Sequence, residues 1–203
     1  MLARYLSSFV VHFSLLAILF LFSLILIGCA APVIKMPKPM PDIVKEYKSV
    51  VLHGDKPGMH DSGVHVEEGD YITILADGEI DHYISSTTRG IDGPNGLLLI
   101  RIGEKNFAWR YYDRYSTAAA VSESGNIYLG IGHGPMDPYG EPSKPDWYLN
   151  IRGHFVADII VWRQNDPIRI ADVLEEASRN NPKNMSLRIL AGVVKNQKEI
   201  LLA

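Results

Sequence analysis

Residues 66–78 read VEEGDYITILADG, and this stretch decides the fold class that we predict for the chain. Within it, Ile72 and Ile74 face one side of an extended strand, whereas Thr73 and Leu75 face the other side. The acidic, glycine-containing start of the stretch is a turn signal. The pattern therefore predicts a half-buried β-strand that begins after a turn.

Similar short runs occupy the chain from residue 47 to residue 162, separated by clusters of Gly, Asp and Pro. No convincing helical pattern precedes residue 166. Many short strands at this spacing predict an antiparallel β-sandwich or jelly roll. The candidate strands are 47–53, 63–66, 70–77, 97–102, 108–109, 118–121, 125–131, 147–151 and 155–162.

After residue 162 the pattern becomes helical. A helix over 168–178 places Ile170, Val173, Leu174 and Ala177 on one face. A second helix is predicted over 185–202. The fold class is therefore mainly β with a short C-terminal helical hairpin, which either packs on the β domain or docks a partner. The predicted domains are a signal peptide (1–28), a tether (29–46), a β-sandwich (47–163) and a helical segment (164–203).

The N-terminal segment is apolar and carries no Asp, Glu, Lys or Arg from residue 5 to residue 27. It ends at 26–29, LIGC, which resembles the lipobox of bacterial lipoproteins. That resemblance implies cleavage before Cys29 and lipid attachment to its thiol, and several acyl chains anchor a protein stably. Ala30, which is not aspartate, implies sorting to the outer membrane. The alternatives are an uncleaved membrane-spanning helix and an incidental buried thiol at Cys29.

Four prolines lie between residues 32 and 41. This composition predicts an extended, polyproline-like tether that holds the folded part off the membrane. A proline-rich recognition peptide is the alternative interpretation.

Composition and motifs exclude several function classes. The net charge of −3 argues against a nucleic-acid binder, and one cysteine excludes a disulfide framework. Neither Gly-x-Ser-x-Gly nor His-Glu-x-x-His is present, so we predict no enzyme. A metal site at His60 and His65 and a glycosidase-like pair, Asp77 with Asp81, are alternatives that we do not favour.

Three stretches carry a family resemblance: 66–78, 96–103 (GLLLIRIG) and 125–131 (GNIYLGI). With 147–151 (WYLNI) as a closing strand, they resemble, in order, the bacterial galactose-binding calcium lectins (the LecA family) and galactose-binding-domain-like proteins. The resemblance implies a β-sandwich whose loops hold one calcium ion, to which sugar hydroxyls bind. Because fold does not settle function, the site has to be compared residue by residue.

That comparison is incomplete at the calcium site. Tyr83 lies one position from the family's calcium-binding tyrosine, but Gly-His-Gly (132–134) stands where the family has an aspartate. Asp137, Glu141 and Asp146 offer oxygens in the same loop, so a rebuilt calcium site competes with a merely solvated loop. No sugar-contacting residue of the family can be carried over, so the resemblance does not support galactose specificity.

Aromatic residues give a separate argument for carbohydrate binding, because sugar rings stack on exposed Tyr and Trp. We expect Trp147 and Trp162, in predicted strands, to be packing residues. The candidate ligand-binding rings are Tyr83, Tyr111, Tyr112 and Tyr139.

Together these features predict a lipid-anchored protein of the bacterial cell envelope that binds a glycan or an envelope partner without catalysis. It would face the periplasm or the cell surface. The alternative is a structural or assembly lipoprotein that docks a partner protein through its C-terminal helices and binds no sugar.

The lipid anchor is testable at one residue. Because Cys29 supplies the only thiol in the chain, Cys29→Ala should abolish the incorporation of radiolabelled palmitate in a bacterial host. An unchanged label would contradict the lipoprotein prediction.

Overall fold

The computed structural model describes residues 33–83, 87–111, 118–180 and 192. All of them belong to the second of the two units into which the chain divides, Met1–Ala31 and Pro32–Ala203. Cys29, Tyr112 and nearly all of the helix predicted over 185–202 lie outside the described residues. No helix within the described ranges is long and apolar enough to cross a membrane.

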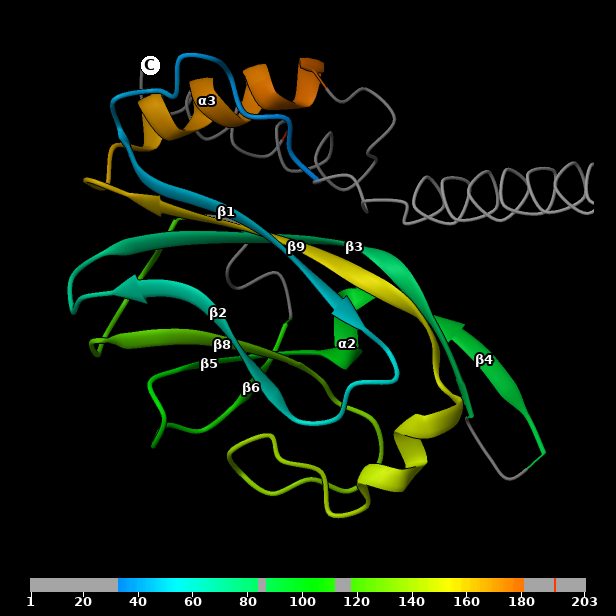
Figure 1. Ribbon diagram of the computed structural model, residues 1–203. Coiled ribbons are helices and arrows are strands. Elements are labelled where there is room, and N and C mark those ends of the chain that lie inside the picture. The colour runs from blue at the N-terminus through cyan, green and yellow to red at the C-terminus, as the bar shows by residue number, and fades with distance from the viewer. Residues whose placement is uncertain (1–32, 84–86, 112–117, 181–191, 193–203) are drawn as a thin grey trace, which may run out of the picture. The chain divides into compact units, whose positions relative to one another are not determined.

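Two antiparallel sheets form the body of the second unit, as two facing layers in Figure 1. One sheet has the order β1-β9-β3-β4, with β7 also paired to β3, and the other has the order β2-β8-β5-β6. The prediction of a mainly β, antiparallel sandwich is therefore confirmed. The strands are β1 (Val44–His53), β2 (Met59–Val66), β3 (Tyr71–Tyr83), β4 (Arg89–Asp92), β5 (Leu98–Ile102), β6 (Trp109–Arg110), β7 (Ala119–Ala120), β8 (Gly125–Ile131) and β9 (Arg152–Trp162).

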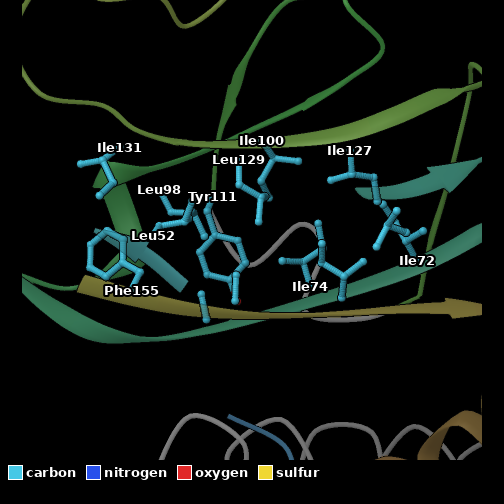
Figure 2. Packing of buried hydrophobic residues seen from close by; sticks show 14 of the residues in the cluster. Leu52, Ile72, Ile74, Leu98, Ile100, Tyr111, Ile127, Leu129, Ile131 and Phe155 are labelled. Carbon is cyan, nitrogen blue, oxygen red and sulfur yellow. The ribbon is translucent and has the colours of Figure 1, made fainter. Parts of the chain in front are cut away.

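The core lies between the sheets and is built by alternate residues of each strand. Ile72 and Ile74 of β3 point inward, as the period-two pattern predicts, and meet side chains from the opposite sheet such as Ile127 and Leu129 of β8 (Figure 2). All four are fully buried. Apolar residues at every second position therefore hold the two layers together.

Strand β3 continues well beyond the end predicted at residue 77. Gly78, which reads as a turn signal, has a positive φ of 112° and lies against β9, where a Cβ would come within 2.3 Å of the His154 carbonyl oxygen. Only glycine permits this close approach. The strand therefore continues through Ile80 and His82 to Tyr83.

The prediction of a strand over 147–151 is wrong, because most of this segment belongs to a 3-10 helix, η1 (Pro145–Asn150). Pro145 stands in its first turn, and the buried residues Tyr148 and Ile151 are three apart. A spacing of three matches the 3-10 repeat and does not match a strand. Trp147, expected to be a packing residue, is therefore 43% exposed.

Smaller differences concern short elements. Strand β4 was not predicted, because its sequence, RGID, has no apolar alternation. A four-residue helical turn, α2 (Pro94–Leu97), precedes β5. Strand β9 begins at Arg152, three residues earlier than predicted.

The helix α3 (Pro167–Asn180) confirms the first predicted C-terminal helix. Its expected apolar face is buried at Ile170, Val173, Leu174 and Ala177. In Figure 1, α3 lies on the side of the β1-β9-β3 sheet that faces away from the second sheet, so it forms a third layer.

Part of the predicted tether packs in the same layer. Val33 and Ile34 are buried, and the Ile34 N–H donates to an Asp158 carboxylate oxygen of β9. The Ile34 carbonyl accepts a hydrogen bond of 3.0 Å from the Tyr47 hydroxyl. Residues 33 and 34 are therefore fixed on the sheet, because two apolar side chains and their backbone groups find partners there.

Asp158 is a carboxyl group buried completely on the outer face of β9. Burial raises its pKa above the ordinary 3.8, because desolvation outweighs hydrogen bonds from Ser49, Ile34, Tyr47 and Val33. The pKa of the Tyr47 hydroxyl is raised as well, first by burial and then by Asp158. The segment 33–34 is thus attached to an acid whose protonated form the fold favours.

The raised pKa predicts a pH dependence of stability. The stabilisation associated with protonated Asp158 is fully present below pH 3.8, the ordinary pKa, and is lost as the pH rises through the raised folded pKa. Asp158→Asn keeps an oxygen acceptor for Ile34 but does not ionise. Its free energy of unfolding, relative to the native protein, should therefore increase with pH, by about 1.4 kcal/mol for each unit of pKa shift.

Urea denaturation of both proteins between pH 3 and pH 8 measures this difference. Ser49→Ala is the control, because it removes a hydrogen bond to Asp158 and keeps the ionisable carboxyl, so its stability should still fall as the pH rises through the Asp158 pKa. Parallel stability curves for Asp158→Asn and the native protein would contradict the prediction.

Candidate functional site

Two histidines lie together at one end of the sandwich. His82 follows Ile80 at the inward-facing positions of β3, and His133 comes two residues after Ile131, the last residue of β8. Their rings are 5.0 Å apart between centroids and lie edge to face at 76°. We call their surroundings the loop-end site, which consists of His82, Tyr83, Arg89, Asp92, His133 and Trp147.

Only one of the two ring nitrogens of His82 has a hydrogen-bond partner within the described residues. It is 7% exposed, and its Nε2 lies 2.6 Å from the carboxylate Oδ2 of Asp92. Asp92 reaches this position because β4 pairs with β3 in a register that sets Asp92 opposite Ile80. The other ring nitrogen of His82, Nδ1, is buried and has no hydrogen-bond partner within the described part of the chain.

The backbone of His133 is fixed by a hydrogen bond to the Tyr148 hydroxyl. The Tyr148 hydroxyl donates to the Ile131 carbonyl at 2.6 Å and accepts from the His133 N–H at 3.0 Å, so a buried tyrosine of η1 fixes the end of β8. Burial and then the neighbouring His82 lower the pKa of His133 below its ordinary value. The neutral form of this imidazole is therefore favoured at neutral pH.

Arg89 connects three parts of the site. Its Nε donates to the Asp81 carboxylate at 2.7 Å, and its Nη2 donates to the Asn150 carbonyl at 3.0 Å. This links β4 to β3 and to η1, which is seen beside the ends of both strands in Figure 1. The guanidinium also lies over the Tyr83 ring, 4.4 Å from its centroid. The Arg89 bond lowers the pKa of Asp81, which therefore stays ionised.

Two aromatic rings are exposed beside these polar groups. Tyr83 is 40% exposed and Trp147 is 43% exposed. The indole packs against Gly134, where φ is +76° and a Cβ would come within 2.8 Å of the ring. Lys144 lies near the ring as well, with Nζ 4.8 Å from its centroid. Gly134 therefore allows the loop to pass close behind Trp147.

The three predicted ligand-binding tyrosines that the structure describes are not brought together. Of these three, only Tyr83 belongs to the loop-end site. The prediction that Tyr111 is a ligand-binding ring is wrong, because its side chain is 5% exposed and lies in the core between the sheets (Figure 2). Tyr139 stacks on Phe107, with ring centroids 5.9 Å apart, and its carbonyl binds Arg101. Tyr112 lies outside the described residues.

Two of the three acids predicted to hold calcium, Asp137 and Glu141, have other partners. One Asp137 oxygen accepts from the N–H groups of Tyr139 and Glu141, which closes the loop on itself. Glu141 lies 3.8 Å from Arg101, and Asp146 is in the first turn of η1. Within the described residues, no three side chains of His, Cys, Asp or Glu are grouped to hold a metal. Calcium takes six to eight oxygens, including backbone carbonyls, and its binding in this loop stays a prediction.

The two weaker alternatives also find ordinary partners. His65 pairs with Asn126 at 2.9 Å, and His60 lies 3.4 Å from the Lys56 carbonyl. Asp81 is engaged by Arg89. His60, His65 and Asp81 therefore each take part in an ordinary polar contact with a neighbouring residue.

Sequence reasoning missed most of the loop-end site. His82 and His133 each lie two positions after an inward-facing isoleucine, a signal that extending both strands would have revealed. Arg89 and Asp92 could not be found in this way, because they act through a strand pairing with no apolar pattern.

No protein-family model matches the sequence, and no curated protein matches it. A solved structure described as the EclA N-terminal domain, a PllA-like lectin, is similar with a TM-score of 0.42 and 18% sequence identity. The similarity covers 56% of this chain and 94% of that one. The fold class stated above rests on the two sheets of the present structure.

Proposed function

We propose that this protein binds a carbohydrate, without catalysis, at the loop-end site. The observation that carries the proposal is the exposed indole of Trp147, which is supported from behind by Gly134. A rigid, half-exposed indole offers an apolar face on which the C–H face of a sugar ring stacks. The exposed ring of Tyr83 supplies a second surface of the same kind.

Fixed polar groups surround these rings. Asp92 and Asp81 are held by His82 and Arg89, so their carboxylates offer acceptors to hydroxyl groups from defined positions. Arg89 is in turn bound to the Asn150 carbonyl. A few fixed polar groups beside an apolar surface are characteristic of small-ligand sites, in which they determine orientation.

The same proposal places the protein in the bacterial envelope, attached to the outer membrane through lipid on Cys29. The support is the apolar segment that ends in the lipobox-like LIGC. Val33 and Ile34 are packed on the sheet, so only three residues separate Cys29 from the folded part. The folded unit would then lie close to the lipid surface, because three residues reach roughly 10 Å when extended.

The assembly alternative, with a partner docked on the C-terminal helices, has less support from α3. Its apolar residues are buried, so within the described residues this helix offers no wide apolar face. The second predicted helix lies outside the described residues, and docking there stays a prediction.

Trp147→Ala tests carbohydrate binding. Removing the indole should weaken binding of the glycan by roughly tenfold, because the stacking surface is lost. A glycan array on the full chain in detergent, with and without calcium, would identify the ligand. Titration calorimetry with that glycan then compares the variant with the native protein.

Phe107→Ala is the matched control, since Phe107 is an exposed aromatic residue in the loop after β5 and contacts Tyr139. It should leave the affinity unchanged. Loss of binding in Phe107→Ala with retention in Trp147→Ala would place the ligand at the Phe107–Tyr139 pair. An array without any glycan signal would contradict the proposed function.

A further inference from the structure

We propose that Asn95 is a site of spontaneous covalent modification, at which the side-chain amide is converted to a carboxylate in the folded protein. The backbone nitrogen of the next residue, Gly96, forms a bond to the Asn95 Cγ, and the side-chain nitrogen leaves as ammonia together with the proton of the Gly96 amide. Water then opens the five-membered succinimide ring and leaves aspartate or isoaspartate. The net reaction consumes one water and releases one ammonia, and it does not depend on carbohydrate binding.

Asn95 and Gly96 occupy the two central positions of a type II β-turn. The backbone inside α2 is non-helical at both residues, with φ −62° and ψ 109° at Asn95 and φ 97° and ψ −22° at Gly96. These angles match a type II turn, in which the second central position requires a positive φ and therefore glycine. Type I and type II turns differ by a rotation of the peptide between the two central residues. The attacking nitrogen therefore belongs to the peptide of the turn that rotates most easily.

The two reacting groups are not held in place. Asn95 is exposed, and within the described residues neither its side-chain amide nor the Gly96 N–H makes a hydrogen bond. A Cβ built on Gly96 would meet nothing within 4 Å, so the space around this peptide is open. The hydrogen bonds of the turn lie on either side of the central peptide, since Leu98 N–H donates to the Pro94 carbonyl and Arg110 donates to the Gly96 carbonyl. Rotation of the central peptide therefore breaks no hydrogen bond of its own.

Other asparagines lack this combination. Asn126 Nδ2 donates to Asp61 at 2.9 Å, and the residue that follows, Ile127, is fully buried in β8. Asn165 is exposed, but the following N–H, that of Asp166, donates to a backbone carbonyl at 3.2 Å. A side chain or a nitrogen that is already hydrogen-bonded has to be released before it can react. We therefore expect the modification at Asn95 and not at these two positions.

Incubation of the full chain in detergent at mildly alkaline pH, followed by proteolysis and mass spectrometry of the peptides, tests the inference. The peptide that contains Asn95 should gain the mass of an amide NH₂ replaced by OH, and it should split into aspartyl and isoaspartyl forms on chromatography. The peptides that contain Asn126 and Asn165 should remain unchanged over the same time. Modification of Asn126 or Asn165 while Asn95 stays intact would overturn the inference.

Two variants separate ring closure from other routes. Gly96→Ala should slow the conversion by roughly tenfold, because the added Cβ hinders the attacking nitrogen. An alanine is strained at a φ of 97°, so Asn95→Gln is the matched variant that leaves the turn intact. It keeps an exposed amide before Gly96, but its longer side chain would have to close a six-membered ring, so its peptide should not be converted. Conversion of either variant at the native rate would show that the inference is wrong.

Discussion

The pairing of β9 between β1 and β3 is the constraint on which the rest of the structure depends. The residues on its inner face fill the core. Its outer face includes Asp158 and Trp162, which are both fully buried. The pairing also requires two glycines, because a Cβ at Gly78 or Gly153 would lie 2.3 Å or 2.1 Å from a carbonyl oxygen of the neighbouring strand. Because these glycines allow the close approach, β3 and β9 stay paired as far as Asp81 and Arg152. The next residue of β3, His82, therefore lies at the end of the sandwich.

The sequence predicts those parts of the fold that rest on local periodicity. Ile72 and Ile74 of β3 and Leu174 of α3 occupy the predicted faces. The reason is that residues on one face of a strand are two positions apart, and residues on one face of a helix are three to four positions apart. The 3-10 helix η1 was misread as a strand although Tyr148 and Ile151 carry its three-residue spacing. A short segment gives too few residues to separate the two periods.

The loop-end site was less predictable, for a different physical reason. Its groups come from β3, β4, β8 and η1, and each position depends on a register between strands that are distant in the sequence. Arg89, for example, becomes a connecting residue only once β4 pairs with β3 and η1 comes within reach of its guanidinium. No pattern within the sequence RGID indicates those partners, whereas Tyr83 was found because a family resemblance pointed to it.

The loop-end site combines exposed aromatic rings with buried polar groups. Trp147 and Tyr83 are exposed, whereas Nδ1 of His82 is buried and has no hydrogen-bond partner within the described part of the chain. The ring of His133 lies near both, with its centroid 6.2 Å from that of Trp147 and 5.0 Å from that of His82. The Tyr148 hydroxyl fixes the backbone at His133 and binds η1 to the end of β8, so it holds Trp147 of η1 beside the two histidines.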